Sequence, residues 1–136
     1  MKYAVLAGRI LFSLIFLIAG LGHFSAQSIG YAGAQGVPLA SVLVPLSGIV
    51  SLAGGLSILL GYKAKLGAWL LIIFLIPVTF MLHKFWTIPD PMMRQMDMAM
   101  FLKNLGLLGA AFFIAFFGAG PLSVDIKLKQ LHSLNY

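Results

Sequence analysis

The sequence predicts an all-α protein, a transmembrane four-helix bundle with both termini inside the cell (N-in/C-in). Four long apolar stretches, a charged content of only 9% and a mean hydropathy of +1.04 support this prediction, since soluble domains carry about 25% charged residues. We expect helices at about 3–24, 38–60, 66–86 and 97–118. Each has about 20 residues or slightly more, the length that crosses a ~30 Å hydrocarbon layer at 1.5 Å per residue.

A soluble helical domain is the alternative, and the run Leu66–Phe80 argues against it. Helices of soluble proteins keep a polar face, whereas this run has almost no polar residue. The 136 residues leave room for four crossings and short loops but for no second domain. We therefore predict a single integral membrane domain over residues 1–136.

The net charge of +6 does not indicate nucleic-acid binding. The basic residues are neither clustered on an amphipathic face nor interleaved with exposed aromatic residues. Instead they flank the predicted spans, while the connection 25–37 has no Lys or Arg. Loops rich in Lys and Arg stay in the cytoplasm, which places the connections 25–37 and 87–96 outside. The flanking basic residues are Lys2, Arg9, Lys63, Lys65, Lys127 and Lys129.

No metal site is expected in this chain. It has no cysteine, which excludes thiol redox relays, iron–sulfur clusters and Cys-based zinc sites as activities of the chain alone. Haem ligation has no support beyond His23 and His83 on two different helices. The methionine-rich run 92–100 offers soft ligands for Cu(I), but its sulfurs do not align on one helical face. Packing is the better interpretation of these flexible side chains.

The second span carries a pattern of small residues. Ser47, Ser51 and Gly55 follow one another at four-residue steps. This spacing lets two helix backbones approach closely in a membrane. We interpret it as a packing surface.

Ionisable groups inside a bilayer are costly, so each one is a candidate for function. Because successive helices alternate in direction, the ends of the first and third helices and the start of the fourth lie at one level, near the outer leaflet. Two interpretations stay open: a pocket for a small polar or quinone-like ligand, with His exchanging protons, or groups that pair and lock the bundle. The residues at this level are His23, His83, Lys84, Asp97, Lys103 and Asn104.

Two cations lie further inside their helices. Lys103 is expected to run its stem along a packed seam with Gly106 and Ala110. Arg9 is about 9 Å into the first helix at helical rise. It either snorkels to the cytoplasmic surface or forms an ion pair with Asp125, the acid that the topology places on the same side.

Several stretches of the chain resemble the DoxX family of small four-helix membrane proteins. The resemblance covers nearly the whole chain, and the block at the end of the fourth helix is its most specific part. Ser51 stands where that family commonly has Glu, and a serine takes up no proton in the physiological pH range. The stretches that carry the resemblance are Arg9, Gly20–His23, Gly36–Pro38, Leu60–Gly61, His83–Trp86, Met100–Leu105 and Gly118–Asp125.

The resemblance implies a multi-pass protein of the bacterial inner (plasma) membrane with a role in redox chemistry, such as quinone or thiosulfate oxidation or quinone stress. We therefore predict a membrane oxidoreductase component that engages a quinone near the outer leaflet. Since the chain has no nucleotide-binding glycine motif and no Cys, the quinone or a redox partner protein would carry the electrons. The alternatives are a non-enzymatic membrane subunit or scaffold of a stress-response complex, and a small transporter component.

The predicted roles of the site residues follow from this hypothesis. His83 and Lys103 would polarise or protonate the ligand, with His23 in support. Further ligand contacts are assigned to Trp86, Asn104, Asp97 and Lys84, and a structural ion pair to Arg9 and Asp125.

Overall fold

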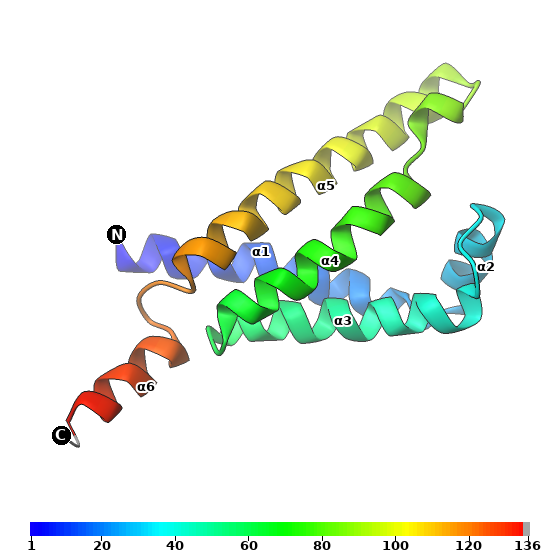
Figure 1. Cartoon of the computed structure of the whole chain (residues 1–136). Coiled ribbons are helices and arrows are strands. Elements are labelled where there is room, and N and C mark those ends of the chain that lie inside the picture. Colours follow the sequence, from blue (N-terminus) through cyan, green and yellow to red (C-terminus); the bar gives the residue numbers. More distant parts are fainter. Residues whose placement is uncertain (135–136) are drawn as a thin grey trace.

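The computed structural model describes residues 1–134, and these residues form helices and connecting turns without a strand (Figure 1). The elements are α1 (Lys2–Gly22), α2 (Ala26–Ala34), α3 (Ala40–Leu60), α4 (Ala64–Leu82), the 3-10 helix η1 (Phe85–Thr87), α5 (Pro91–Phe117) and α6 (Val124–Ser133). Within the described residues, four segments are long and apolar enough to cross a membrane, namely α1, α3, α4 with η1, and α5. The predicted helical membrane bundle is confirmed.

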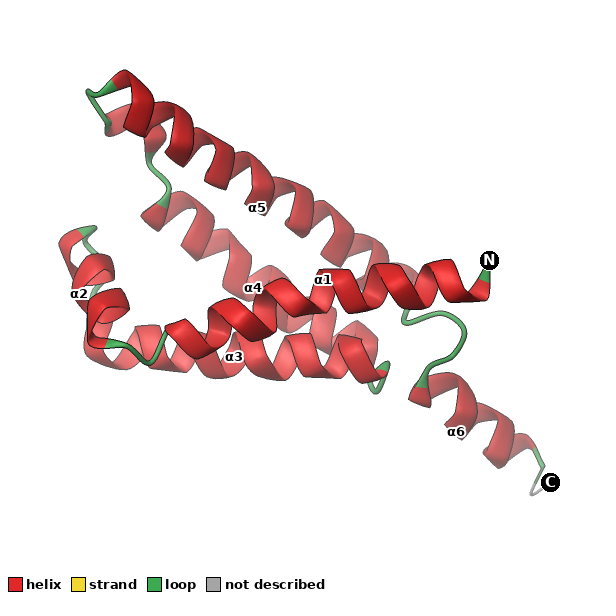
Figure 2. Ribbon diagram, turned by 180° about the vertical axis from the view of Figure 1, so that it is seen from behind, coloured by secondary structure: helices red, strands yellow, loops and turns green. Residues whose placement is uncertain are grey.

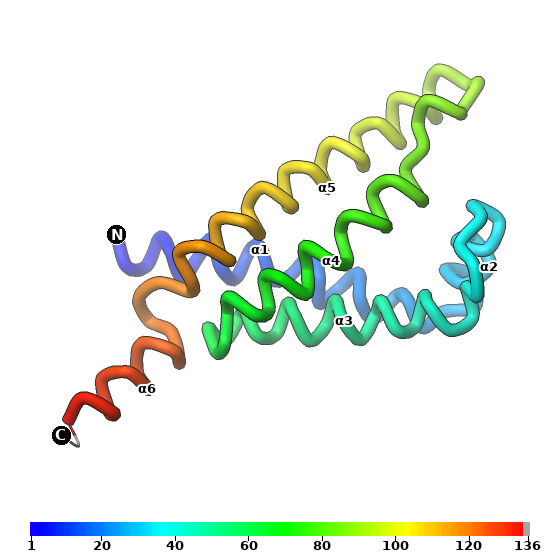
Figure 3. Tube along the Cα trace, in the orientation of Figure 1, coloured from blue at the N-terminus to red at the C-terminus, as the bar shows by residue number. Residues whose placement is uncertain are grey.

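The four spans pack in chain order, with α1 against α3, α3 against α4 and α4 against α5. Both described ends of the chain lie at one end of the bundle, which we call the N/C end (Figure 1). The other end carries α2 and the turn between α4 and α5, and we call it the α2 end. Figure 3 shows that α4 and α5 lean away from α1 and α3 toward the α2 end. The assignment of the N/C end to the cytoplasm stays a prediction.

Glycines on both faces of α3 set its distance from the neighbouring helices. A Cβ added to Gly48 would lie 3.0 Å from the carbonyl oxygen of Gly20 on α1. A Cβ added to Gly54 would lie 3.0 Å from the carbonyl oxygen of Gly67 on α4. Within lipid the hydrophobic effect does not drive one helix against another. Close packing of helix backbones stabilises their association instead. The prediction of a small-residue packing surface on this helix is confirmed.

Ser51 strengthens the contact between α1 and α3. Its side chain is fully buried, and its hydroxyl donates a hydrogen bond of 2.9 Å to the carbonyl oxygen of Phe16. In lipid a hydroxyl without a partner is costly, so this bond fixes Ser51 on the α1 side. The residue at this position therefore joins two helices.

Two predicted helix boundaries are corrected at the α2 end. α4 ends at Leu82 rather than 86, and the chain continues through η1. The last span begins at Pro91 rather than near Asp97, because the Asp90 carboxylate accepts a hydrogen bond of 2.8 Å from the backbone N–H of Met93. An Asp cap followed by Pro in the first turn is a favourable helix start.

Two short helices were not predicted. α2 lies within the expected loop 25–37 and is capped by Ser25, whose hydroxyl accepts from the N–H of Ser28 at 3.2 Å. α6 follows the last span and is capped by Ser123. Figure 2, from behind, shows α6 projecting away from the bundle at the N/C end.

The core lies between α1, α3 and α4. Its buried cluster includes Phe16, Ile58, Leu71 and Leu75. α5 packs on α4 and contributes little to this core, since Asn104 and Ala111 are its buried residues. The helix therefore lies at the edge of the bundle and presents most of its apolar side chains to lipid.

Candidate functional site

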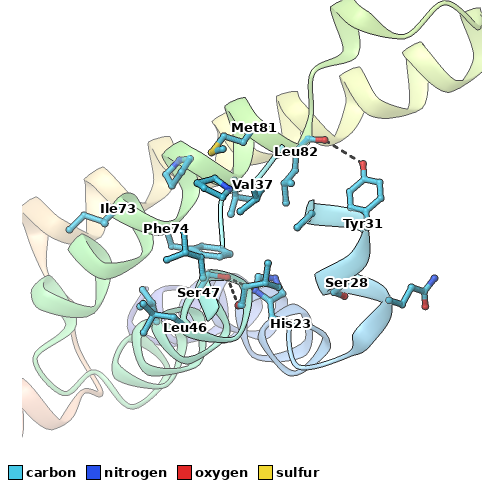
Figure 4. A pocket seen from close by; sticks show the side chains of 18 residues that line it. His23, Ser28, Tyr31, Val37, Leu46, Ser47, Ile73, Phe74, Met81 and Leu82 are labelled. Carbon is cyan, nitrogen blue, oxygen red and sulfur yellow. Dashed lines mark hydrogen bonds between the residues drawn. The ribbon is translucent and has the colours of Figure 1, made fainter. Parts of the chain in front are cut away.

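A cavity of about 780 Å³ lies at the α2 end, between α2, α3 and α4 (Figure 4). At this end α4 leans away from α3 (Figure 1), and residues of α2 line the side between them. The volume is within the range of small-molecule sites, about 300–1,000 Å³. Most of its wall is apolar, including Leu46, Val50, Ile73, Phe74 and Met81.

A hydrogen-bonded pair supplies polar atoms to this apolar wall. Nδ1 of His23 lies 2.9 Å from Oγ of Ser47, and the Ser47 hydroxyl donates to the carbonyl oxygen of Val44 at 2.7 Å. The ring of His23 also contacts that of Phe74, with centroids 5.6 Å apart. The imidazole is therefore held between α3 and α4, on the side of the cavity.

Two hydrogen bonds join the α2 segment to the end of α4 and to the turn after it. The hydroxyl of Tyr31 donates to the carbonyl oxygen of Leu82 at 3.4 Å, and Nζ of Lys84 donates to the carbonyl oxygen of Gln35 at 3.0 Å. Desolvation raises the pKa of the Tyr31 phenol, and the Asp97 carboxylate adds to the rise. The phenol therefore stays protonated and keeps its role as a donor.

His83 and Asp97 form a hydrogen-bonded pair beside the cavity. Nδ1 of His83 lies 2.9 Å from Oδ1 of Asp97, and the two side chains are 20% and 15% exposed. The pair joins the end of α4 to the second turn of α5. This arrangement matches the interpretation in which polar groups lock the bundle.

The other predicted site residues lie outside the cavity wall. Lys103 is exposed on α5, and its Nζ donates to the sulfur of Met100 at 3.4 Å. The packed seam expected for this lysine is therefore corrected, because α5 turns the neighbouring Asn104 toward α4. Trp86 is half exposed and packs edge-on against Phe85 and Phe101. Within the described chain, His23 is the one predicted site residue that lines the cavity.

Arg9 does not bind Asp125 directly, which corrects the predicted ion pair. Its Nη1 donates to the carbonyl oxygen of Ala119 at 3.1 Å and its Nη2 to that of Leu122 at 2.8 Å. The side chain is 6% exposed, so it does not snorkel into water. Its planar guanidinium suits two carbonyl groups of the segment between α5 and α6.

Asp125 acts on the neighbouring backbone instead. Its carboxylate accepts hydrogen bonds from the N–H of Lys63 at 2.8 Å and of Ala64 at 3.1 Å. These are among the free donors at the start of α4, where the helix dipole favours a negative charge. The acid therefore caps α4 from the first turn of α6.

Sequence reasoning missed Ser47 and Tyr31 as residues of the cavity wall. The spacing of Ser47 predicts helix packing, and the composition around Tyr31 predicts a polar loop. One signal was available for α2, since Ser25 is a favourable helix cap ahead of an alanine-rich segment. The cavity itself has no sequence signal, because it depends on the lean of α4.

The comparisons with known proteins place the chain in a family. The model of the SURF4 family matches residues 1–131. The chain belongs to the SURF4 family. It is 32% identical over 132 residues to Inner membrane protein YqjF of Escherichia coli (strain K12), covering 93% of this chain and 92% of that protein.

A eukaryotic relative is also similar to this SURF4-family chain. The Surfeit locus protein 4 homolog of Schizosaccharomyces pombe is 30% identical over 128 residues, which covers 93% of this chain but 38% of the yeast protein. No solved structure matches the chain. The predicted multi-pass location in the bacterial inner membrane is confirmed by the four spans and by the Escherichia coli relative.

The resemblance to DoxX is therefore wrong. The block Gly118–Asp125, its most specific part, forms the corner that binds Arg9 and caps α4. Gly118 and Gly120 have φ of 82° and 69°, so the glycines of this corner, like Asp125, have a structural role. The match of these short motifs consequently did not identify the family.

Proposed function

We propose that this SURF4-family protein is a non-enzymatic membrane protein that binds a small molecule with an apolar body in the cavity at the α2 end. The observation that supports this proposal is a volume of about 780 Å³ with largely apolar walls and few polar side chains. Pockets of this size and lining are the usual sites of small ligands. The redox role, with its quinone and redox partner protein, depended on the resemblance to DoxX and is set aside.

The position of the cavity determines which molecules reach it. Its α3 and α4 walls belong to two membrane spans, so a molecule dissolved in the bilayer arrives next to them. Apolar burial contributes roughly 25 cal/mol per Å², and side chains such as Ile73 and Val78 offer that surface. An apolar molecule of lipid-like chemistry therefore suits this site better than a water-soluble metabolite.

A pair of variants on α4 tests the proposal. Val78 lines the cavity, and Val78→Trp fills part of it. Ile76 is on the same helix, is 45% exposed and lies outside the lining, so Ile76→Trp is the matched control. Each protein is purified in mild detergent, and bound 4-nonylphenol is measured by equilibrium dialysis and mass spectrometry.

We expect Val78→Trp to reduce binding of this probe by about tenfold, which corresponds to 1.4 kcal/mol. Ile76→Trp should bind as the wild type does. Equal binding by the wild type and Val78→Trp would show that the probe lies elsewhere, and the proposal would then be wrong.

A further inference from the structure

We infer that the cavity at the α2 end selects ligands whose polar end donates a hydrogen bond, such as a hydroxyl group. This inference rests on the proposed function and names the chemical class of the ligand. It follows from the hydrogen bonds of His23, which determine the role of each ring nitrogen.

The first step is the proton of Ser47. Its hydroxyl carries one proton, which it donates to the carbonyl oxygen of Val44 at 2.7 Å. Because the Val44 carbonyl oxygen can only accept, we assign the Ser47 proton to that bond, and Oγ of Ser47 then accepts from Nδ1 of His23, which lies 2.9 Å away. The ring nitrogen Nδ1 consequently carries its proton.

The second step is the other ring nitrogen. In a neutral imidazole that is protonated on Nδ1, Nε2 has a free lone pair and acts as an acceptor. Nε2 of His23 has no hydrogen-bond partner among residues 1–134, and it is not one of the fully buried unpaired atoms of this part of the chain. Nε2 is therefore an accessible acceptor without a partner.

The third step is the surroundings of the ring. His23 lines the cavity together with Ser47 and with Phe74, which the imidazole contacts (Figure 4). The remaining wall near the ring is apolar and includes Leu46 and Val50. A ligand that fills the cavity displaces water from Nε2, and an acceptor left without a donor in such a site is costly. A ligand hydroxyl restores the lost hydrogen bond, whereas an ether or a carbonyl group does not.

Other polar groups of the wall do not replace this acceptor. The hydroxyl proton of Tyr31 is donated to the carbonyl oxygen of Leu82, so the phenol oxygen offers an acceptor position as well. The hydroxyl of Ser28 lies 2.9 Å from that of Ser25, which also accepts from the backbone N–H of Ser28 at 3.2 Å, so Ser28 is engaged within the α2 cap. The arrangement on α1, α2 and α3 thus favours a donor on the ligand.

Two probes with the same apolar body test the inference. 4-Nonylphenol has a hydroxyl donor, and its methyl ether, 4-nonylanisole, has none. Binding of both is measured by equilibrium dialysis against the full-length protein in detergent. We expect the phenol to bind about tenfold more tightly than the ether, a difference of about 1.4 kcal/mol, because the ether cannot donate the hydrogen bond to Nε2.

The variant His23→Phe removes the acceptor and keeps a flat ring against Phe74. It should bind both probes with equal affinity, after correction for their partition into detergent. If His23→Phe does not fold, Ser47→Ala provides the second variant, because loss of the Ser47 oxygen releases Nδ1 and should narrow the preference for the phenol.

The outcomes separate this inference from the proposed function. Equal affinity of the wild type for the two probes, or a preference for the phenol that persists in His23→Phe, would overturn the inference while leaving a ligand-binding cavity in place. Failure of the wild type to bind either probe would overturn the proposed function and, with it, the inference.

Discussion

Arg9 and Asp125 stabilise the same corner of the N/C end without binding each other. The guanidinium of Arg9 donates to carbonyl groups after α5, and the carboxylate of Asp125 accepts from N–H groups at the start of α4. Asp125 thus satisfies donors that the start of α4 leaves without partners, and Arg9 satisfies acceptors of the segment between α5 and α6. The corner joins α1, α4 and the segment after α5 into one unit.

Replacement of Arg9 by leucine should strongly destabilise the protein. The carbonyl groups of Ala119 and Leu122 would lose their donors in a buried place, at a cost of about 3 kcal/mol. The measurement is the midpoint of thermal unfolding in detergent, followed by tryptophan fluorescence. Lys2→Leu on the same helix is the control, since Lys2 is exposed. Equal midpoints for the two variants would contradict the prediction.

Asp125→Ala should loosen the first turn of α4. The N–H groups of Lys63 and Ala64 would lose their acceptor, which costs about 1 kcal/mol for a helix cap. Hydrogen–deuterium exchange should become faster at residues 63–67 and stay unchanged in the middle of α3. Asp125→Asn keeps an acceptor oxygen and should show a smaller effect. Unchanged exchange in the alanine variant would argue against this cap.

Gly54→Ala should separate α3 from α4. The new Cβ would lie 2.7 Å from a side-chain carbon of Leu71 and 3.0 Å from the carbonyl oxygen of Gly67, and overpacking of this kind costs about 1–3 kcal/mol. Gly106→Ala is the control, because no atom lies within 4 Å of its Cβ position. The control should be neutral or slightly stabilising, since alanine favours a helix. Thermal unfolding of both variants decides between these expectations.

The pair between His83 and Asp97 should show a measurable coupling. A double-mutant cycle with His83→Gln and Asp97→Asn isolates the interaction across 2.9 Å. Because both side chains are partly exposed, we expect a coupling energy of about 1 kcal/mol. Additive effects of the two substitutions would show that the pair does not contribute to stability.

The orientation in the membrane can be tested with fusions. Alkaline phosphatase is active only outside the cytoplasm, so a fusion at Asp90, at the α2 end, should be active. A fusion at Lys63, at the N/C end, should be inactive. The reverse pattern would show that the protein is inserted with its termini outside.

The four spans were predictable because a membrane span depends on average hydropathy over about 20 residues. α2 was harder to predict, since its nine residues include Gly30 and Gly33 and their helical structure depends on contacts with α3. α5 begins at Pro91 rather than near Asp97. The cap at Asp90 stabilises a helix start there although the first turns are polar. Helix caps of this kind are visible in the sequence, but hydropathy alone predicts different helix ends.

The candidate site depended on information that the sequence does not contain. His23 was predicted as a site residue, and it lines the cavity. The hydrogen bond between His23 and Ser47 and the exposure of Lys103 both depend on which face of a helix packs against the next helix. For α5 the sequence does not indicate which face packs on α4. One side of the helix contacts α4 and the rest contacts lipid, so apolar residues occur on all sides.

The length of α5 links the protein to the thickness of its membrane. With 27 residues, the helix is about 40 Å long at 1.5 Å per residue, whereas the hydrocarbon layer is ~30 Å. Tilting is the usual response of a long span to such a mismatch, and α4 leans together with α5 (Figure 3). The same tilt separates α4 from α3, so a thinner bilayer would widen the space beside Phe74 and a thicker one would narrow it. The lipid composition around the protein would thereby control the space available to the ligand that we propose.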